Sequence, residues 1–190
     1  MSTQTPSIKV IKVGKLIDGR DAGLKERMAV VVEEGLISRV VPQQEMSLLE
    51  VALVEELDFP EATLVPGLVD SHTHTNFTGT GETIEEMDED GDDIHLLHAT
   101  KNARTALESG VTTMRDNGGW HQVVFALKDG IRRGLVPGPR IMASGRPITI
   151  SGGHMWMLGS QADGENGVRM AVRQLVQEGA DWIKAVASGG

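Results

Sequence analysis

The chain has 190 residues, of which 39% are hydrophobic and 24% are charged, a composition typical of a soluble globular protein. Its net charge of −9, from 27 acidic and 18 basic residues, disfavours nucleic acids and anionic membranes as partners, because both are bound through clustered Lys and Arg side chains. Cysteine is absent, which excludes disulfides and thiolate metal sites, so a metal ion would need His or carboxylate ligands.

The first residues do not resemble a targeting segment. Residues 1–6 (MSTQTP) have neither the basic region nor the apolar region of a signal peptide. No apolar run approaches the ~20 residues that a membrane-spanning helix needs. We therefore expect a cytoplasmic protein that does not enter a membrane.

Residues 1–64 contain only short β-like segments, in which apolar residues alternate with polar ones or Val predominates. Glu34 and Gly35 separate two of these segments and suit a hairpin turn. The segments are residues 8–13, 28–33, 36–41, 51–57 and 63–65. Short strands at this density predict a small N-terminal β-sandwich, or a β-barrel, over residues 1–64.

Residues 65–190 alternate strand-like and helix-like segments. Gly110, Gly134 and Gly179 each end a helical pattern and lead toward the next apolar run, as in repeated βα units of a parallel sheet. The expected strands are residues 68–72, 111–115, 140–144 and 182–187, and the expected helices are residues 94–107, 122–133 and 167–177.

An open doubly wound sheet and a closed barrel both produce this alternation. An open sheet should have a Gly-rich phosphate-binding turn that leads from its first strand directly into a helix, but no helix follows residues 75–81 directly. We therefore predict an α/β fold, with a β-sandwich module followed by the first half of a (β/α)₈ TIM barrel. A complete barrel takes ~250 residues, so four βα units leave it incomplete.

His72 and His74 lie at the end of the first of these strands. Side chains two residues apart on a strand point to the same face, so both imidazoles should project together. Imidazole is the commonest metal-binding side chain, and barrel enzymes hold their active sites at the C-terminal ends of the strands. This His-x-His pair is therefore a candidate metal site, although the same spacing also occurs by chance.

Lys184 is unusual because it lies within residues 182–187, which otherwise have the pattern of a buried strand. A buried ammonium is costly unless it finds a partner or becomes neutral. One interpretation is a lysine paired with a carboxylate, or one at the edge of a sheet. The other is a neutral amine that captures CO₂ as a carbamate, whose carboxylate can bridge two metal ions.

Several segments, in the same order, resemble the amidohydrolase superfamily. The run VPGLVDSHTH at residues 65–74 is similar to that superfamily's first-strand motif, and GKLIDG at residues 14–19 is similar to its N-terminal β-module. Three further runs narrow the resemblance to the prolidase and imidazolonepropionase-like branch, which includes Xaa-Pro dipeptidases and carboxypeptidases. These runs are GLVPGPRI at 134–141, SGGH at 151–154 and GADWIK at 179–184.

The resemblance implies a binuclear site with two divalent ions, usually zinc. His72 and His74 would bind the more buried ion, and a CO₂-derived carbamate on Lys184 would bridge both ions. A metal-bound hydroxide would then attack an amide carbonyl. The superfamily's two later histidines and its proton-shuttling aspartate have no counterpart among these residues, so we assign no catalytic residue within the chain.

His154 follows the third strand and, from the resemblance, is a candidate for contact with a carboxylate of the substrate; the alternative is a histidine on a surface loop. Nearby Arg146 is expected to be solvated, or else to pair with an anionic substrate.

The acidic stretch 82–93 is expected to be a solvated loop, with Asp92 or Asp93 capping the next helix. The alternative is a loop at the barrel mouth that favours cationic substrates or disfavours anionic ones. His95 and His98 on that helix, and His121 at the start of the next, are expected to be structural histidines on helix surfaces rather than metal ligands.

The leading hypothesis is a metal-dependent amidohydrolase with dipeptidase-like or carboxypeptidase-like activity on a small amide. Hydrolysis of a cyclic amide or an arylamide is the alternative within the same superfamily. A different class of hypothesis is a non-catalytic half-barrel that serves as an assembly partner, with an unmodified Lys184. Expected partners are the small substrate, the remainder of the barrel and, from the resemblance, further copies of the same protein.

Overall fold

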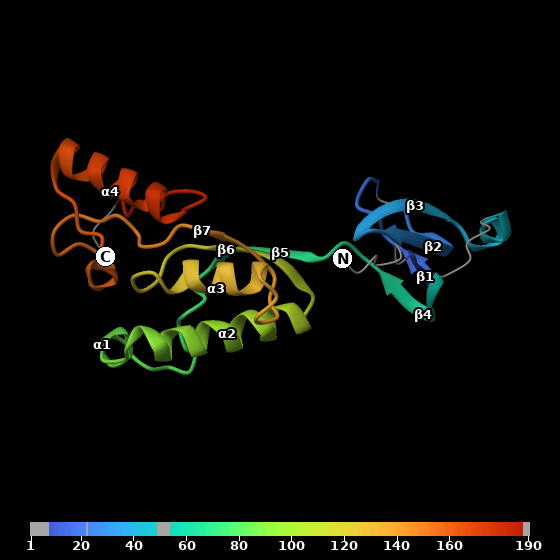
Figure 1. Ribbon diagram of the computed structural model, residues 1–190, viewed down its shortest axis with the longest axis horizontal. Coiled ribbons are helices and arrows are strands. Elements are labelled where there is room, and N and C mark those ends of the chain that lie inside the picture. Colours follow the sequence, from blue (N-terminus) through green and yellow to red (C-terminus); the bar gives the residue numbers. More distant parts are fainter. Residues whose placement is uncertain (1–7, 22, 49–53, 188–190) are drawn as a thin grey trace, which may run out of the picture. The chain divides into compact units, whose positions relative to one another are not determined.

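The computed structural model describes residues 8–21, 23–48 and 54–187. The chain divides into two compact units, Met1–Pro66 and Gly67–Gly190 (Figure 1). The division falls two residues after the end of the β-module expected from the sequence.

The first unit is one four-stranded sheet with the strand order β3-β2-β1-β4. Strand β1 pairs antiparallel with β2 and parallel with β4, and β2 pairs antiparallel with β3. The predicted hairpin joins β2 to β3, and Glu34 and Gly35 both have the positive φ angles that a tight hairpin turn requires. The elements are β1 (Ile8–Leu16), β2 (Lys25–Glu33), β3 (Leu36–Pro42), the 3₁₀ helix η1 (Gln43–Leu48) and β4 (Val54–Leu64).

Strand β4 runs without a break through the two β-like segments expected at residues 51–57 and 63–65, although residues 51–53 lie outside the described residues. The register of β1 and β4 shifts between Val13 and Lys15. There, a Cβ atom on Gly14 would lie 1.9 Å from the carbonyl oxygen of Pro60. The β-bulge at this point, with a glycine that leaves room for the Pro60 carbonyl, allows β4 to contain a proline, which has no N–H for strand pairing.

Both faces of this sheet carry buried apolar residues. Val13, Met28 and Val30 are buried in one cluster, while Val10 and Val31 are buried in another. The described residues of the unit form one sheet only, so the second sheet of the predicted sandwich is not seen among them, and the sandwich stays a prediction.

The second unit begins with a three-stranded parallel sheet in the order β5-β6-β7. Figure 1 shows α2 and α3 side by side against this sheet, and buried side chains from α2, α3 and β7 form one apolar cluster. This is the βα alternation that the sequence predicts. The elements are β5 (Leu68–Thr73), α1 (Ile84–Asp88), α2 (Asp92–Glu108), β6 (Val111–Asp116), α3 (Val123–Arg132), β7 (Arg140–Ala143), the 3₁₀ helix η2 (Trp156–Leu158) and α4 (Gly164–Glu178).

The fourth strand expected at residues 182–187 does not form as a regular strand. Only an isolated parallel bridge between Ile148 and Ala185 is present. The segment still lies beside β7, because Asp181 donates its backbone N–H to the carbonyl of Ala143 over 2.8 Å. Between these two pairings, Gly145 has a φ of +75° and Pro147 lacks an N–H, so the ladder is interrupted.

The acidic stretch at residues 82–93 is not a simple loop, because α1 forms within it. Thr83 and Glu86 make a reciprocal capping box at the start of that helix. Gly91, rather than Asp92 or Asp93, is the N-cap of α2. The two aspartates occupy its first turn, where their negative charges interact favourably with the helix dipole. In the described part of the chain, no helix is both long and apolar enough to span a bilayer.

Candidate functional site

The two histidines of the predicted site lie together at the C-terminal end of β5. His72 is the last residue but one of the strand and is exposed, and His74 follows immediately after the strand and is partly buried. Their ring centroids are 5.6 Å apart, with the ring planes inclined at 56°. The two-residue spacing on an extended strand therefore does bring the imidazoles next to each other.

The imidazole of His74 is held in one orientation. Its Nδ1 atom lies 2.7 Å from the carbonyl oxygen of Gly118, and the ring stacks on Phe77 at 4.9 Å between centroids. A carbonyl oxygen can only accept a hydrogen bond, so Nδ1 carries a hydrogen, and in the neutral imidazole the lone pair is then on Nε2. A backbone carbonyl behind a metal-binding histidine commonly has this role, which makes His74 suited to bind an ion through Nε2.

The donor set within the chain fits a metal ion but does not enclose one. His72 and His74 supply two imidazole nitrogen ligands, whereas a zinc ion takes about four ligands. Among the described residues, no group of three or more His, Cys, Asp or Glu side chains is arranged to hold a metal. Further ligands would have to come from other side chains, such as a modified Lys184.

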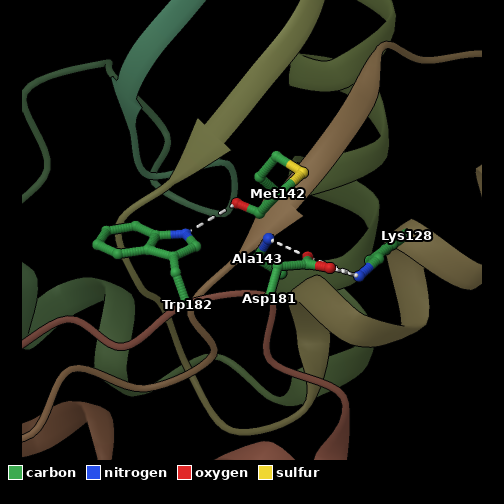
Figure 2. A network of polar contacts seen from close by, with 5 residues as sticks. All are labelled: Lys128, Met142, Ala143, Asp181 and Trp182. Atoms are coloured by element: carbon green, nitrogen blue, oxygen red, sulfur yellow. Dashed lines mark hydrogen bonds and ion pairs between the residues drawn. The ribbon is translucent and has the colours of Figure 1, made fainter.

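The segment that leads to Lys184 is fastened to β7 and α3 by a polar network (Figure 2). The Asp181 carboxylate accepts hydrogen bonds from the backbone N–H of Ala143 at 2.8 Å and from Lys128 Nζ at 2.7 Å and 2.6 Å. Trp182 donates its indole N–H to the carbonyl of Met142 at 3.2 Å. Two successive residues thus fix the chain shortly before Lys184.

Lys184 itself is partly buried rather than enclosed within a strand, which corrects the expectation of a buried position. Its carbonyl oxygen accepts a hydrogen bond from the backbone N–H of Ile148 at 2.9 Å. This pairing puts Lys184 beside the residues that follow β7, in the fourth position after β5, β6 and β7.

His154 is exposed on the loop before η2. The start of that loop is fixed by Asp163, which accepts hydrogen bonds from Ser151, and by Gln161, which accepts one from Gly152 at 2.7 Å. The hydrogen bonds from Ser151 lower the pKa of the Asp163 carboxyl below its ordinary value. An exposed His154 is compatible both with contact to a substrate and with a surface-loop histidine of no catalytic importance, so its role stays a prediction.

Arg146 is buried, contrary to the expectation of a solvated side chain. Its Nη2 atom lies 2.5 Å from Glu178 Oε2, and its Nη1 atom donates to the carbonyl of His121 at 3.1 Å. Glu178 closes α4 and His121 precedes α3, so the guanidinium joins two helices. These contacts assign Arg146 to structure and leave no free guanidinium for an anionic substrate.

An aromatic stack extends from the histidine pair into the interior. Phe77, which stacks on His74, meets Trp120 edge to face at 5.1 Å, and Trp120 stacks on His95 at 4.3 Å. Trp120 also donates its indole N–H to Asp88 at 2.7 Å. His95 is 1% exposed, so the expectation that the helical histidines lie on the surface is wrong for this one.

Burial lowers the pKa of His95 below its ordinary value of 6.5, and the nearby carboxylates of Asp90 and Asp92 oppose the shift only partly. As the pH falls from 6.5 toward the folded-state pKa, the unfolded chain binds a proton at His95 that the folded chain does not bind. The free energy of unfolding therefore does not vary with pH through His95 above pH 6.5. Below pH 6.5 it falls because of His95, by no more than about 1.4 kcal/mol per pH unit.

We expect His95→Phe to flatten this acid limb, because phenylalanine keeps an aromatic partner for Trp120 and cannot titrate. The measurement is urea unfolding at a series of pH values from neutral to mildly acidic, with His154→Gln as the control on an exposed histidine. Parallel pH dependences of wild type and His95→Phe would contradict the assignment.

Two polar residues near the histidine pair were not recognised from the sequence. Asp116 ends β6 and is completely buried, and Asn102 on α2 donates to the carbonyls of Thr75 and Phe77 at 2.9 Å and 2.8 Å. The sequence pattern around Asp116 could have identified it. It follows the β-branched run at residues 111–115 and precedes Gly118 and Gly119, so it lies at the C-terminal end of a strand, where barrel enzymes have their active sites. Asn102 gives no such signal within its helix.

Comparisons with known proteins agree with this architecture. The Amidohydrolase family model matches residues 63–190. An ochratoxinase from Aspergillus niger is 28% identical over 100% of this chain and 44% of its own length. A solved Xaa-Pro dipeptidase with methionine bound in its active site is 29% identical with a TM-score of 0.82, over 97% of this chain and 48% of that one. A putative prolidase from Bifidobacterium longum is 30% identical with a TM-score of 0.74, over 97% and 42%.

The chain therefore spans less than half the length of each of these relatives. The family match covers the second unit from just before β5, including both histidines and Lys184. Members of this family are generally metal-dependent, in keeping with the histidine pair. By the family match, the βα architecture and the order of its motifs, this chain belongs to the amidohydrolase family.

Proposed function

We propose that the protein carrying this chain hydrolyses the C–N bond of a small, peptide-like amide in a metal-dependent reaction. The observation that carries the proposal is the pairing of His72 and His74, in which the Gly118 carbonyl holds the Nδ1 side of the His74 imidazole and leaves Nε2 as the atom for a metal ion. Family membership supports a hydrolase, and relatives that are a Xaa-Pro dipeptidase and a prolidase support a peptide-like substrate.

Each candidate residue has a distinct task in this proposal. His72 and His74 would hold one divalent ion, for which zinc is the proposed metal, and Lys184, as a CO₂-derived carbamate, would supply a carboxylate to this ion and to a second one. The bound ions supply Lewis acidity toward the amide carbonyl and toward water. Phe77, stacked on His74, shields one face of that imidazole from water. Asp181 and Trp182 hold the backbone from which Lys184 extends.

The narrower substrate is a dipeptide, with the exposed His154 as a contact for its carboxylate. A cyclic amide or an arylamide is the alternative within the same superfamily. Cytoplasmic location and assembly into a homo-oligomer, both expected from the sequence, also stay proposals.

The test uses the purified full-length protein. Its metal content is measured by elemental analysis, and hydrolysis is followed with a Xaa-Pro dipeptide, an arylamide and a cyclic amide. We expect bound zinc and turnover of the dipeptide, with both lost in the His72→Asn/His74→Asn variant. A folded protein that binds no divalent metal and cleaves none of the three would refute the proposal and favour a non-catalytic assembly role with an unmodified Lys184.

A further inference from the structure

Asp116 is a completely buried carboxylate at the end of β6, beside the histidine pair. Its Oδ2 atom accepts hydrogen bonds from the backbone N–H and the hydroxyl of Thr75, at 2.8 Å and 2.6 Å. Its Oδ1 atom accepts one from the backbone N–H of Gly118 at 2.9 Å. A buried carboxylate is costly unless it is well hydrogen-bonded, so these three bonds account for its position.

The two residues that Asp116 holds are the neighbours of one histidine. Thr75 directly follows His74 in the chain, and Gly118 supplies the carbonyl oxygen that lies 2.7 Å from His74 Nδ1. One carboxylate thus fixes both the backbone from which the imidazole extends and the acceptor that orients it. A shift of either partner would change the direction of Nε2.

The turn from Asp116 to Gly118 is constrained on its other sides as well. Gly118 has a φ of +118°, and a Cβ atom there would lie 2.7 Å from Pro147 Cδ, so only glycine fits. Asn117 donates its backbone N–H to the carbonyl of Thr73 at 2.7 Å, which ties the turn to the end of β5. These contacts act together with the Asp116 carboxylate to hold the turn from which the Gly118 carbonyl points to His74.

We propose that Asp116 is a positioning residue for His74: by holding Thr75 and Gly118, it selects the imidazole tautomer with hydrogen on Nδ1 and presents Nε2 to the metal ion. The metal-binding part of this inference rests on the proposed function. The tautomer does not, because it is set by protein atoms alone and can be measured without metal.

The primary test is the tautomer of His74 in the metal-free full-length protein. Long-range ¹⁵N–¹H correlation spectra of protein labelled at histidine distinguish Nδ1–H from Nε2–H, and His74→Asn assigns the signal. In Asp116→Asn the amide can satisfy only part of the donor set, and in Thr75→Val the hydroxyl donor is lost. We expect the wild type to hold the Nδ1–H tautomer, and both variants to populate Nε2–H.

The matched control is Asp181→Asn, which also removes a carboxylate that accepts from a strand-end N–H, that of Ala143, but does not contact Thr75 or Gly118. We expect it to leave the His74 tautomer unchanged.

The second readout is zinc affinity, measured by competition with a chelator. Asp116→Asn should bind zinc about tenfold more weakly than wild type, which is the lower end of the effect usual for groups that hydrogen-bond to a metal ligand.

The outcomes separate the two proposals. Folded Asp116→Asn and Thr75→Val proteins that keep the wild-type tautomer overturn the positioning role, even if zinc affinity falls. A tautomer shift in a protein that binds no zinc in any form supports the positioning role and refutes the proposed metal-dependent function. A tautomer shift accompanied by weaker zinc binding supports both.

Discussion

Replacing Lys184 by alanine is expected to lower kcat/KM for amide hydrolysis by the full-length protein at least about a hundredfold, or ~2.7 kcal/mol of transition-state stabilisation. This follows from the proposed carbamate, whose carboxylate would be lost with the amine. The anchoring of Asp181 and Trp182 on β7 does not involve the Lys184 side chain, so the backbone of the segment should stay in place.

Chemical rescue makes this prediction specific. Alanine leaves room for a small carboxylate, so formate or acetate should restore part of the activity of Lys184→Ala and have no such effect on wild type. Lys101→Ala, on the exposed surface of α2, is the control and should retain full activity. A ¹³C signal from labelled bicarbonate on wild type but not on Lys184→Ala would identify the carbamate directly. Full activity of Lys184→Ala would contradict its assignment.

The spacing of apolar residues predicted the long helices because each helix buries only one of its faces. Helices expected at residues 94–107, 122–133 and 167–177 form as α2, α3 and α4, and each has an apolar stripe packed in a core. Their ends differ from the expected ones by a few residues, since caps such as Gly91 decide where a helix begins.

The fourth strand could not be predicted correctly because its pairing depends on a distant segment. Residues 182–187 have a β-branched, apolar pattern, but a strand also needs a continuous partner. Here the partner ends at Ala143, and the positive φ of Gly145 and the missing N–H of Pro147 interrupt it before Ile148. Local propensity carries no information about that interruption.

The residues of the candidate site also divide into those that local spacing predicts and those whose role depends on distant partners. His72 and His74 could be found from the sequence because a two-residue spacing on a strand fixes their common side. The roles of Asp116 and His95 arise from partners more than 20 residues away: Thr75 for the carboxylate and Trp120 for the imidazole. A polar residue is assigned to the interior only when such a partner is known, so both required the three-dimensional structure.

A second large effect is expected at the buried ion pair of Arg146 and Glu178, whose side chains are 8% and 15% exposed. In Arg146→Met the Glu178 carboxylate keeps its bond from Gln174 at 2.9 Å but loses its only ion pair in the described residues, and the His121 carbonyl loses a donor. Breaking one side of a buried pair typically costs about 3–5 kcal/mol, so we expect a loss of unfolding free energy of this size.

All three tryptophans lie in the second unit, so urea unfolding followed by their fluorescence reports the unit that contains this pair. Removing both charges, in Arg146→Met/Glu178→Leu, should recover most of the loss because no uncompensated charge remains. Arg104→Met breaks the exposed pair with Glu108 on α2 and should leave the unfolding midpoint unchanged. If the double variant were as unstable as Arg146→Met, the loss would come from packing of the arginine stem rather than from the stranded carboxylate.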